Sequence, residues 1–165
     1  MLFESERLSY RRFEEADASF FYELNLDEEV MRYTGDVAFE SVESARQFVR
    51  QYKHYDEYGY GRWSVVRKTD NKLIGWCGLK FHPTENYIDL GYRFARKEWG
   101  QGYATEAGKA SLDYGKSAFD VKEVVGRTAA GNAASIRVLE KLGFAFWKKA
   151  PCEGITDSLF YRIRL

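Results

Sequence analysis

The chain has few of the residues that mark secreted, membrane or metal-binding proteins. Its 165 residues include only two cysteines, two histidines and two prolines. Cys77 and Cys152 form no CxxC pair, and His54 and His82 form no HExxH motif, so neither a disulfide framework nor a bound metal is predicted. Because no signal peptide or long apolar run is present, we expect a reduced, cytoplasmic protein without a membrane partner.

A net charge of either sign is also missing, since 25 Lys and Arg residues balance 25 Asp and Glu residues. Without the long-range attraction of a basic domain, nucleic acid is not an expected partner, although a local basic pocket for a phosphate remains compatible with the sequence. Hydrophobic residues make up 45% of the chain, which predicts a packed core. No repeat or linker divides the sequence, so residues 1–165 are expected to form one domain.

The hydrophobic pattern predicts a mixed α/β fold with a partly parallel sheet. Strands are predicted at residues 7–13, 63–68, 72–81, 87–94, 123–128, 144–149 and 158–164. Helices are predicted at residues 17–24, 27–33, 101–118 and 133–142, and from residue 41 onward. The turns at 69–71 and 82–86 are short, so the second to fourth strands should form an antiparallel meander. By residue type, Asp17 suits an N-cap, as does Ser41 or the alternative Ser44.

Two glycines one residue apart, Gly100 and Gly102, lie where a predicted strand ends and a helix begins. Glycine allows a left-handed turn there, and the turned backbone directs N–H groups and the positive end of the helix at one place. The first helical turn has no carboxylate before Glu106, which suits an anionic ligand. The alternative is a tight turn into a buried helix, and the helix has small residues that would pack closely: Ala104, Ala107, Gly108, Ser111 and Gly115.

Two other phosphate-binding loops do not match these residues. A Walker loop needs four residues between its glycine and the Gly-Lys pair, but five separate Gly102 from Gly108, and Ala110 follows Lys109. A dinucleotide fingerprint needs a third glycine where Thr105 stands. A nucleotide-binding protein is therefore a weak alternative, which would require ATP or NAD to bind better than coenzyme A.

The glycine turn resembles the acyl-CoA pyrophosphate loop of the GNAT superfamily of N-acyltransferases, whose pattern is Arg/Gln-x-x-Gly-x-Gly/Ala. The longer segment Trp99 to Ala107 (WGQGYATEA) resembles the Rim-type branch, which includes acetyltransferases of ribosomal-protein N-termini. Lys97 stands where the family has Arg or Gln, and it retains a charge but not the bidentate fork.

Four further segments resemble the same branch, in the expected order. They are Glu4-Ser5-Glu6-Arg7-Leu8, Leu73-Ile74-Gly75, Asp89-Leu90-Gly91-Tyr92, and Asn132-Ala133-Ala134-Ser135 with Glu140-Lys141-Leu142-Gly143-Phe144. The resemblance thus spans nearly the whole chain. It implies the GNAT fold, with a central sheet of about seven strands and about four flanking helices. The strands at 87–94 and 123–128, fourth and fifth of the sheet, should splay apart into a cleft.

The resemblance implies acetyl-CoA as the acyl donor and assigns residues to its binding. These are Phe94, Ala95, Arg96, Lys97, Trp99, Gly100, Gln101, Gly102, Tyr103, Ala104, Thr105, Asn132 and Ser135. Phe94 to Arg96 lie where backbone groups of the family's fourth strand bond the pantetheine, and an N–H near Phe94 is expected to stabilise the oxyanion. By residue type alone, Asn132 is equally well explained as a helix N-cap.

The catalytic candidates are Asp89 and Ser135. Asp89 aligns with the family's Glu and is a candidate base, although it also suits an ordinary solvent-facing strand position. The tyrosine that many GNAT enzymes offer to the leaving thiolate is replaced by Leu139, so Ser135 is the candidate acid. Cys77 has no histidine near it in sequence, so we expect direct attack by the amine without an acyl-enzyme.

The acceptor is the least defined part of the sequence interpretation. The resemblance places its site around residues 33–60 and 150–157, with an aromatic wall formed by Phe39, Tyr52, Tyr55, Tyr58, Tyr60 and Trp63. Glu153 and Asp157 are either attractors of a cationic amine or solvated loop charges. A protein N-terminus is the leading acceptor. The alternatives are a polyamine, amino acid or aminoglycoside, and, in another class, an acyl-CoA sensor without catalysis; the protein is expected to be a monomer or homodimer.

Overall fold

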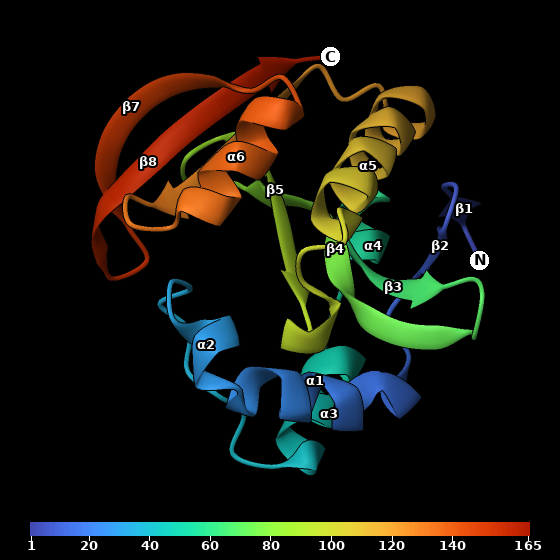
Figure 1. The fold of residues 1–165 in the computed structure, drawn as a ribbon. Helices are drawn as coiled ribbons and strands as arrows, with labels where there is room; N and C mark the ends of the chain where they lie inside the picture. The colour runs from blue at the N-terminus through green and yellow to red at the C-terminus, as the bar shows by residue number, and fades with distance from the viewer.

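Eight strands form one mixed sheet in the computed structural model, which describes residues 1–165 (Figure 1). The strands are β1 (Phe3–Glu4), β2 (Leu8–Arg11), β3 (Arg62–Arg67), β4 (Lys72–His82), β5 (Tyr87–Phe94), β6 (Glu123–Ala129), β7 (Ala145–Cys152) and β8 (Ile155–Arg164). Their order across the sheet is β1-β2-β3-β4-β5-β6-β8-β7. Only β5 and β6 pair in parallel, and every other neighbouring pair is antiparallel.

Helices cover both faces of this sheet. They are α1 (Ala18–Leu26), α2 (Glu28–Met31), α3 (Val42–Arg50), α4 (His54–Tyr58), α5 (Tyr103–Phe119) and α6 (Ala133–Lys141), with 3-10 turns at Glu15–Asp17 and Arg96–Glu98. Figure 1 shows α5 and α6 on one side of β5 and α1, α2 and α3 on the other. No helix is both long and apolar enough to cross a membrane.

The predicted order of elements is confirmed, including the antiparallel meander of β3, β4 and β5. Two short elements were not predicted. The strand β1 has only two residues and α4 only five, which is too short for either to show a hydrophobic period. The sheet therefore has eight strands where the resemblance implied about seven. Six helices flank it, where the hydrophobic pattern predicted five and the resemblance implied about four.

The small residues of α5 bring this helix close to the sheet. A Cβ atom at Gly115 would lie 2.5 Å from Leu79 Cδ1 on β4, and one at Gly108 would lie 2.7 Å from Leu142 Cδ1. Real Cβ atoms do not approach carbon this closely, so the two glycines set the distance between α5 and its neighbours. The close packing expected from these small residues is confirmed, and it fixes where the N-terminus of α5 lies.

The side chain of Asp17 does not cap α1, contrary to the expectation from residue type. Its carboxylate is buried, accepts two hydrogen bonds from Arg11 at 2.8 Å each, and accepts another from Ser64 on β3 at 2.8 Å. It therefore fastens the start of α1 to the sheet. Ser41, by contrast, caps α3 by accepting a hydrogen bond from the Ser44 N–H, so Ser41 and not Ser44 is the N-cap.

The sheet splits between β5 and β6. These strands are paired only where Asp89 faces Val125, and beyond that point they diverge, as the resemblance implied. The split leaves one side of β5 without a neighbouring strand from Leu90 to Phe94. Helices α5 and α6 lie over the opening, which becomes the centre of the site.

Candidate active site

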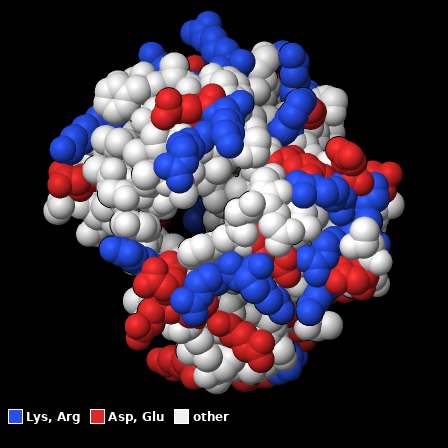
Figure 2. Space-filling view, in the orientation of Figure 1, with Lys and Arg blue, Asp and Glu red and all other residues white.

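One cavity of about 630 Å³ passes through the split in the sheet. It begins at the N-terminus of α5, follows β5 beneath α6, and ends between the loop after α2 and the β7–β8 turn. Figure 2 shows the hollow between these elements, with Lys or Arg atoms at its floor. We call residues 99–105 with the first turn of α6 the glycine end. The arginine end consists of Arg62, Trp76, Arg93 and Arg127 with the loop after α2 and the β7–β8 turn.

The glycine end is built from main-chain groups. Gly100 and Gly102 have φ angles of +77° and +80°, which side-chain-bearing residues rarely adopt. The first helical hydrogen bond of α5 is donated by Glu106 to the Gly102 carbonyl, so the N–H groups of residues 103–105 have no partner within the helix. No side chain caps them. Together with the helix dipole, these donors form an anion site.

Arg7 ties the N-terminal segment to this loop. Its guanidinium donates to the Gln101 carbonyl at 2.9 Å and to Glu106 Oε2 at 2.7 Å, and it lies 4.5 Å from the centre of the Tyr103 ring. Glu106 also accepts hydrogen bonds from the Arg7 N–H and the Ser5 hydroxyl. The one carboxylate in the first turn of α5 is therefore neutralised on the side of the N-terminal segment and does not oppose an anion.

The edge of β5 also presents main-chain groups to the cavity. Ala95 N–H donates to the Ile74 carbonyl on β4, and main-chain groups of successive residues in an antiparallel pair point alternately toward and away from the partner strand. The main-chain groups of Tyr92 and Phe94 therefore point into the split. The Phe94 carbonyl accepts a hydrogen bond from the Trp99 indole at 2.9 Å, which leaves the Phe94 N–H and both groups of Tyr92 free for a ligand.

Most of the residues that the sequence assigned to acyl-CoA binding line the cavity, but four do not. Arg96 turns away to pair with Asp27 at 3.1 Å, and the Ala95 N–H is used within the sheet. Gln101 contributes only its carbonyl, to Arg7, and Lys97 is exposed outside the cavity. For Arg96 and Lys97 the reason is that the chain leaves the sheet after Phe94 and enters a 3-10 turn, which directs these side chains away from the cavity.

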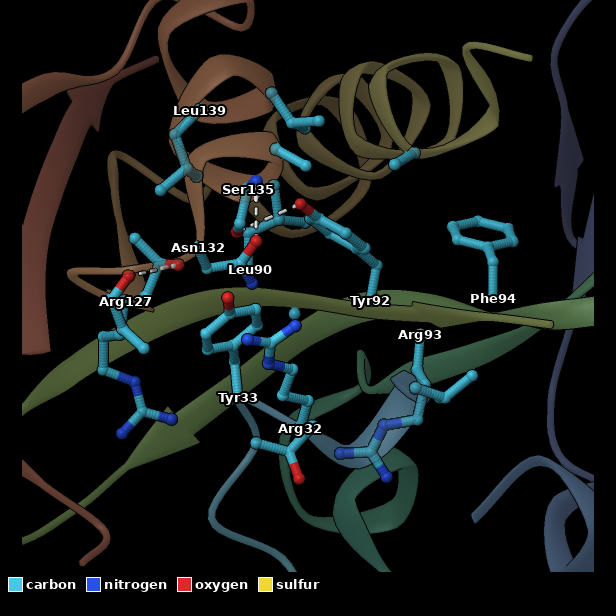
Figure 3. A pocket seen from close by; sticks show the side chains of 18 of the residues that line it. Arg32, Tyr33, Leu90, Tyr92, Arg93, Phe94, Arg127, Asn132, Ser135 and Leu139 are labelled. Atoms are coloured by element: carbon cyan, nitrogen blue, oxygen red, sulfur yellow. Dashed lines mark hydrogen bonds between the residues drawn. The ribbon is translucent and has the colours of Figure 1, made fainter. Parts of the chain in front are cut away.

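Ser135 and Tyr92 form a hydroxyl pair at the middle of the cavity (Figure 3). The Tyr92 hydroxyl donates to Ser135 Oγ at 3.1 Å, and the Ser135 N–H donates to the Asn132 side chain at 3.2 Å. Asn132 is thus the N-cap of α6, as its residue type suggested. Burial raises the pKa of Tyr92 to about 12, so its phenol stays protonated near neutral pH. Tyr92 was not singled out from the sequence, because its partner lies 43 residues further along the chain.

Asp89 has an environment that does not suit a general base. Its side chain is almost completely buried and accepts hydrogen bonds from Arg62 at 3.0 and 3.2 Å, from Arg127 at 3.0 Å and from His82 at 3.2 Å. Burial opposes ionisation, but Arg62, His82 and Arg127 together outweigh it and hold the pKa of Asp89 well below its usual range. A carboxylate held so strongly as an anion is a weak proton acceptor. Asp89 instead joins β3, β5 and β6 where the sheet divides.

Leu139 and Cys77 both belong to the core. A Cβ atom at Gly126 on β6 would lie 2.5 Å from Leu139 Cδ2, so the position that has tyrosine in many GNAT enzymes is filled by aliphatic packing here. Cys77 is fully buried, accepts a hydrogen bond from Ser111 and does not line the cavity. Burial raises the pKa of its thiol to about 12. Neither residue is placed to take part in acyl transfer.

The predicted aromatic wall is wrong. Tyr55, Tyr60 and Trp63 are buried in the core, Tyr52 and Tyr58 pack against it, and Phe39 packs at a tilt against Phe48; none of them lines the cavity. The aromatic residues that do line it are Tyr33, Trp76, Tyr92, Phe94, Trp99 and Tyr103. The two segments expected near the acceptor do contribute, through residues 33, 34 and 36 and residues 152, 153 and 155. Composition alone could not separate core aromatics from cavity aromatics.

Comparison with known proteins identifies the class of protein. The family model described as "Acetyltransferase (GNAT) domain" matches residues 7–145. Among curated relatives, uncharacterized protein YkkB of Bacillus subtilis is 34% identical over 152 residues, covering 87% of this chain and 85% of the relative. The uncharacterized N-acetyltransferase p20 of Bacillus licheniformis is 30% identical over 142 residues, covering 85% and 80%.

A GNAT-family acetyltransferase structure from Bacillus anthracis superposes with a TM-score of 0.83 at 29% identity, covering 99% of this chain and 98% of the other. The chain belongs to the GNAT acetyltransferase family. It is an N-acetyltransferase, and its acyl donor is acetyl-CoA, to which the N–H groups of the glycine end and the free edge of β5 are suited.

Proposed function

We propose that this protein transfers the acetyl group of acetyl-CoA to an α-amine, as Rim-type enzymes do with protein N-termini. The observation that carries the proposal is that the carboxylate beside the split in the sheet, Asp89, is held as an anion by Arg62, His82 and Arg127 and is therefore a weak base for a strongly basic amine. An α-amine has a pKa of about 7.7–8.0 and is partly neutral without help, whereas a lysine amine, with a pKa of about 10.4, is not.

The glycine end is proposed to hold the coenzyme. Its N–H groups at residues 103–105 would bind the pyrophosphate, and Arg7, Arg137 and Lys141 lie close enough to the loop or the cavity to balance its charge. The free main-chain groups of Tyr92 and Phe94 would pair with the pantetheine arm as an added strand. The Phe94 N–H would then donate to the oxyanion that forms at the thioester carbonyl.

Ser135 is proposed to donate a proton to the departing thiolate. Because Tyr92 donates to Ser135 Oγ, the hydrogen of the serine hydroxyl is free to point into the cavity. The nitrogen of the neutral amine attacks the thioester carbon, and the carbon–sulfur bond breaks. The thiolate takes a proton from Ser135 or from water, and that donor regains a proton from the attacking nitrogen, directly or through water, as the amide forms. A thiol pKa of about 8.5 makes the thiolate a moderate leaving group, so this donor assists the reaction without being essential.

A small-molecule amine is the second candidate, because carboxylates of Glu29, Asp36 and Glu153 line the mouth of the cavity. A curated relative, spermidine N(1)-acetyltransferase of Vibrio cholerae, is 25% identical over 144 residues. For the first candidate, a ribosomal-protein-S5-alanine acetyltransferase structure from Vibrio fischeri has a similar fold, with a TM-score of 0.80 at 20% identity. These two similarities support the two candidates by analogy.

The test is thiol release from acetyl-CoA with a panel of amines. The panel contains peptides with free N-termini, the same peptides blocked at the α-amine, and polyamines. We expect release with the free peptides and none with the blocked ones. Release with polyamines alone would replace the α-amine by the small-molecule candidate. Binding of acetyl-CoA without release from any amine would instead favour a sensor.

A further inference from the structure

We infer that the acceptor carries a carboxylate close to its reactive amine and that Arg93, at the arginine end, recognises this carboxylate. The inference deepens the proposed function and rests on it, since it concerns the acceptor of the same reaction. Two sources supply this chemistry: a free amino acid, and a peptide whose first residue is acidic. The argument depends on the charges buried at the arginine end.

Arg93 comes from the strand segment that would hold the thioester. It lies between Tyr92 and Phe94, and because side chains alternate along a strand, its guanidinium emerges on the opposite face of the sheet from theirs. Figure 3 shows Arg93 on the same side of β5 as Arg32 and Tyr33, which follow α2, and on the opposite side from Tyr92 and Ser135. A group bound by Arg93 would therefore be near an amine that approaches through the split.

Arg93 is buried but incompletely paired. Only 10% of its side chain is exposed, and its Nε–H group has no hydrogen-bond partner. One Nη donates to Asn25 at 3.0 Å and the other to Asp36 at 2.6 Å. Asp36 lies in the loop after α2, and about half of its side chain is exposed. Asp36 is therefore the only anion paired with Arg93, and because it is exposed, a ligand carboxylate can replace it or bind beside it.

The buried charges at this end do not balance. Arg62, Arg93 and Arg127 are all nearly buried, with Arg62 and Arg127 sharing the single carboxylate of Asp89. Arg127 also lacks a partner for its Nε–H group, and its other carboxylate partner, Glu153, is half exposed at 3.3 Å. Burying a guanidinium without a full counter-charge is costly, so a carboxylate of the substrate would be bound strongly here.

A polyamine fits this arrangement poorly. It would meet the exposed carboxylates at the mouth but would then have to bring further positive charge toward three buried guanidiniums. An amine accompanied by a carboxylate has the complementary pattern, with its anion toward the floor. The Lys and Arg atoms visible at the floor of the hollow in Figure 2 agree with this polarity.

The experiment compares acceptors that differ only in the carboxylate. Thiol release is measured with peptides that begin with Asp or Glu against those that begin with Asn or Gln, and with free amino acids against their amides. Spermidine is included as an acceptor that has amines but no carboxylate. We expect kcat/KM to be at least about tenfold higher for the carboxylate member of a pair. Preference within the peptide pairs identifies an acidic N-terminus, and preference within the amino acid pairs identifies the small molecule.

Two variants connect this preference to Arg93. In Arg93→Gln, the ratio between the carboxylate acceptor and its amide should fall to near one. In Asp36→Asn, which frees Arg93 from its exposed partner, the KM for the carboxylate acceptor should decrease. Arg46→Gln is the matched control, because Arg46 is a partly exposed arginine on α3 outside the cavity, and its ratio should equal that of the wild type. Thermal melting with and without acetyl-CoA verifies that each variant is folded.

The outcomes separate the inference from the proposed function. Equal turnover of carboxylate and amide acceptors by the wild type would overturn the inference and leave α-amine acetylation intact. Preference for spermidine would overturn both the carboxylate and the α-amine. If Arg93→Gln does not fold, an unchanged KM in Asp36→Asn would count against Arg93.

Discussion

The two ends of the cavity present different kinds of chemical groups to a ligand, main-chain groups at one end and side chains at the other. The glycine end uses main-chain groups, which are the N–H donors at the start of α5 and the free edge of β5. The arginine end uses side chains, with three guanidiniums, Trp76 and parts of two loops. Main-chain donors suit a ligand portion that is the same in every reaction, whereas side chains can be exchanged one at a time. Under the proposed function, the glycine end would therefore bind the constant acyl donor, and the arginine end would determine the acceptor.

The largest effect is expected at Asp89, which pairs with two guanidiniums of the arginine end. Asp89→Ala leaves Arg62 and Arg127 buried without their shared carboxylate, which should lower the free energy of unfolding by about 3–5 kcal/mol. Urea denaturation measures the change. Asp113→Ala is the control, since its ion pair with Lys109 is exposed and should contribute less than about 1 kcal/mol. Equal losses in the two variants would mean that Asp89 does not hold the sheet together.

A second prediction concerns the step between the two ends. Ser135→Ala should lower kcat by about 10- to 100-fold, which is at or below the lower limit of about 100-fold for general-acid contributions, because the thiolate leaves moderately well. The KM for acetyl-CoA should change little. Steady-state kinetics provide both values, and Tyr92→Phe should show a smaller loss because Tyr92 acts only through Ser135. A wild-type kcat in Ser135→Ala would exclude the hydroxyl as the donor.

The third prediction tests the main-chain character of the glycine end. Gly102→Ala places a Cβ on a left-handed residue, at a cost of about 1–2 kcal/mol, and should weaken acetyl-CoA binding by about tenfold as the loop relaxes. Gly154→Ala introduces the same strain at the β7–β8 turn, where φ is +82° and no atom lies within 4 Å of the new Cβ. Calorimetric titration should show unchanged affinity there. Equal weakening in both would mean that general strain, and not the loop, controls binding.

The last prediction is a dependence of stability on pH that arises at His54. His54 on α4 accepts a hydrogen bond from the Phe81 N–H at 3.0 Å, and burial, with help from Arg62, lowers its pKa from 6.5 to about 4. The unfolded chain therefore binds a proton at a higher pH than the folded chain. Stability should decline as the pH falls from about 6.5 to about 4. Denaturation at several pH values should show a flatter dependence in His54→Gln, and an identical dependence would assign the effect elsewhere.

The sequence predicted the glycine end better than the arginine end, for a physical reason. Gly100 and Gly102 are required by local backbone conformation, so their spacing identifies the turn without knowledge of the rest of the fold. Arg7 also serves this end, but its contacts with Gln101 and Glu106 join residues more than 90 positions apart. No local pattern contains that information.

The misplaced residues have the same explanation. Arg96 follows the strand directly, yet its direction depends on Asp27, which lies in a different layer of the molecule. Asp89 aligned with a catalytic position, but its pKa depends on Arg62 and Arg127 from two other strands. Tyr55 and Trp63 are aromatic residues of the kind that line binding sites, but the structure buries both in the core. Contacts between distant segments decide each case.

The split between β5 and β6 also makes coenzyme binding measurable through amide hydrogen exchange. The N–H groups of Tyr92 and Phe94 lie in the middle of an eight-stranded sheet, yet they have the hydrogen-bonding status of an outer edge. In deuterated solvent they should exchange early in the free protein, while the Arg93 N–H between them, directed at β4, exchanges late. A pantetheine arm paired with this edge would slow the two outer amides alone. The exchange rates of these three successive amides would therefore measure coenzyme binding without turnover and without knowledge of the acceptor.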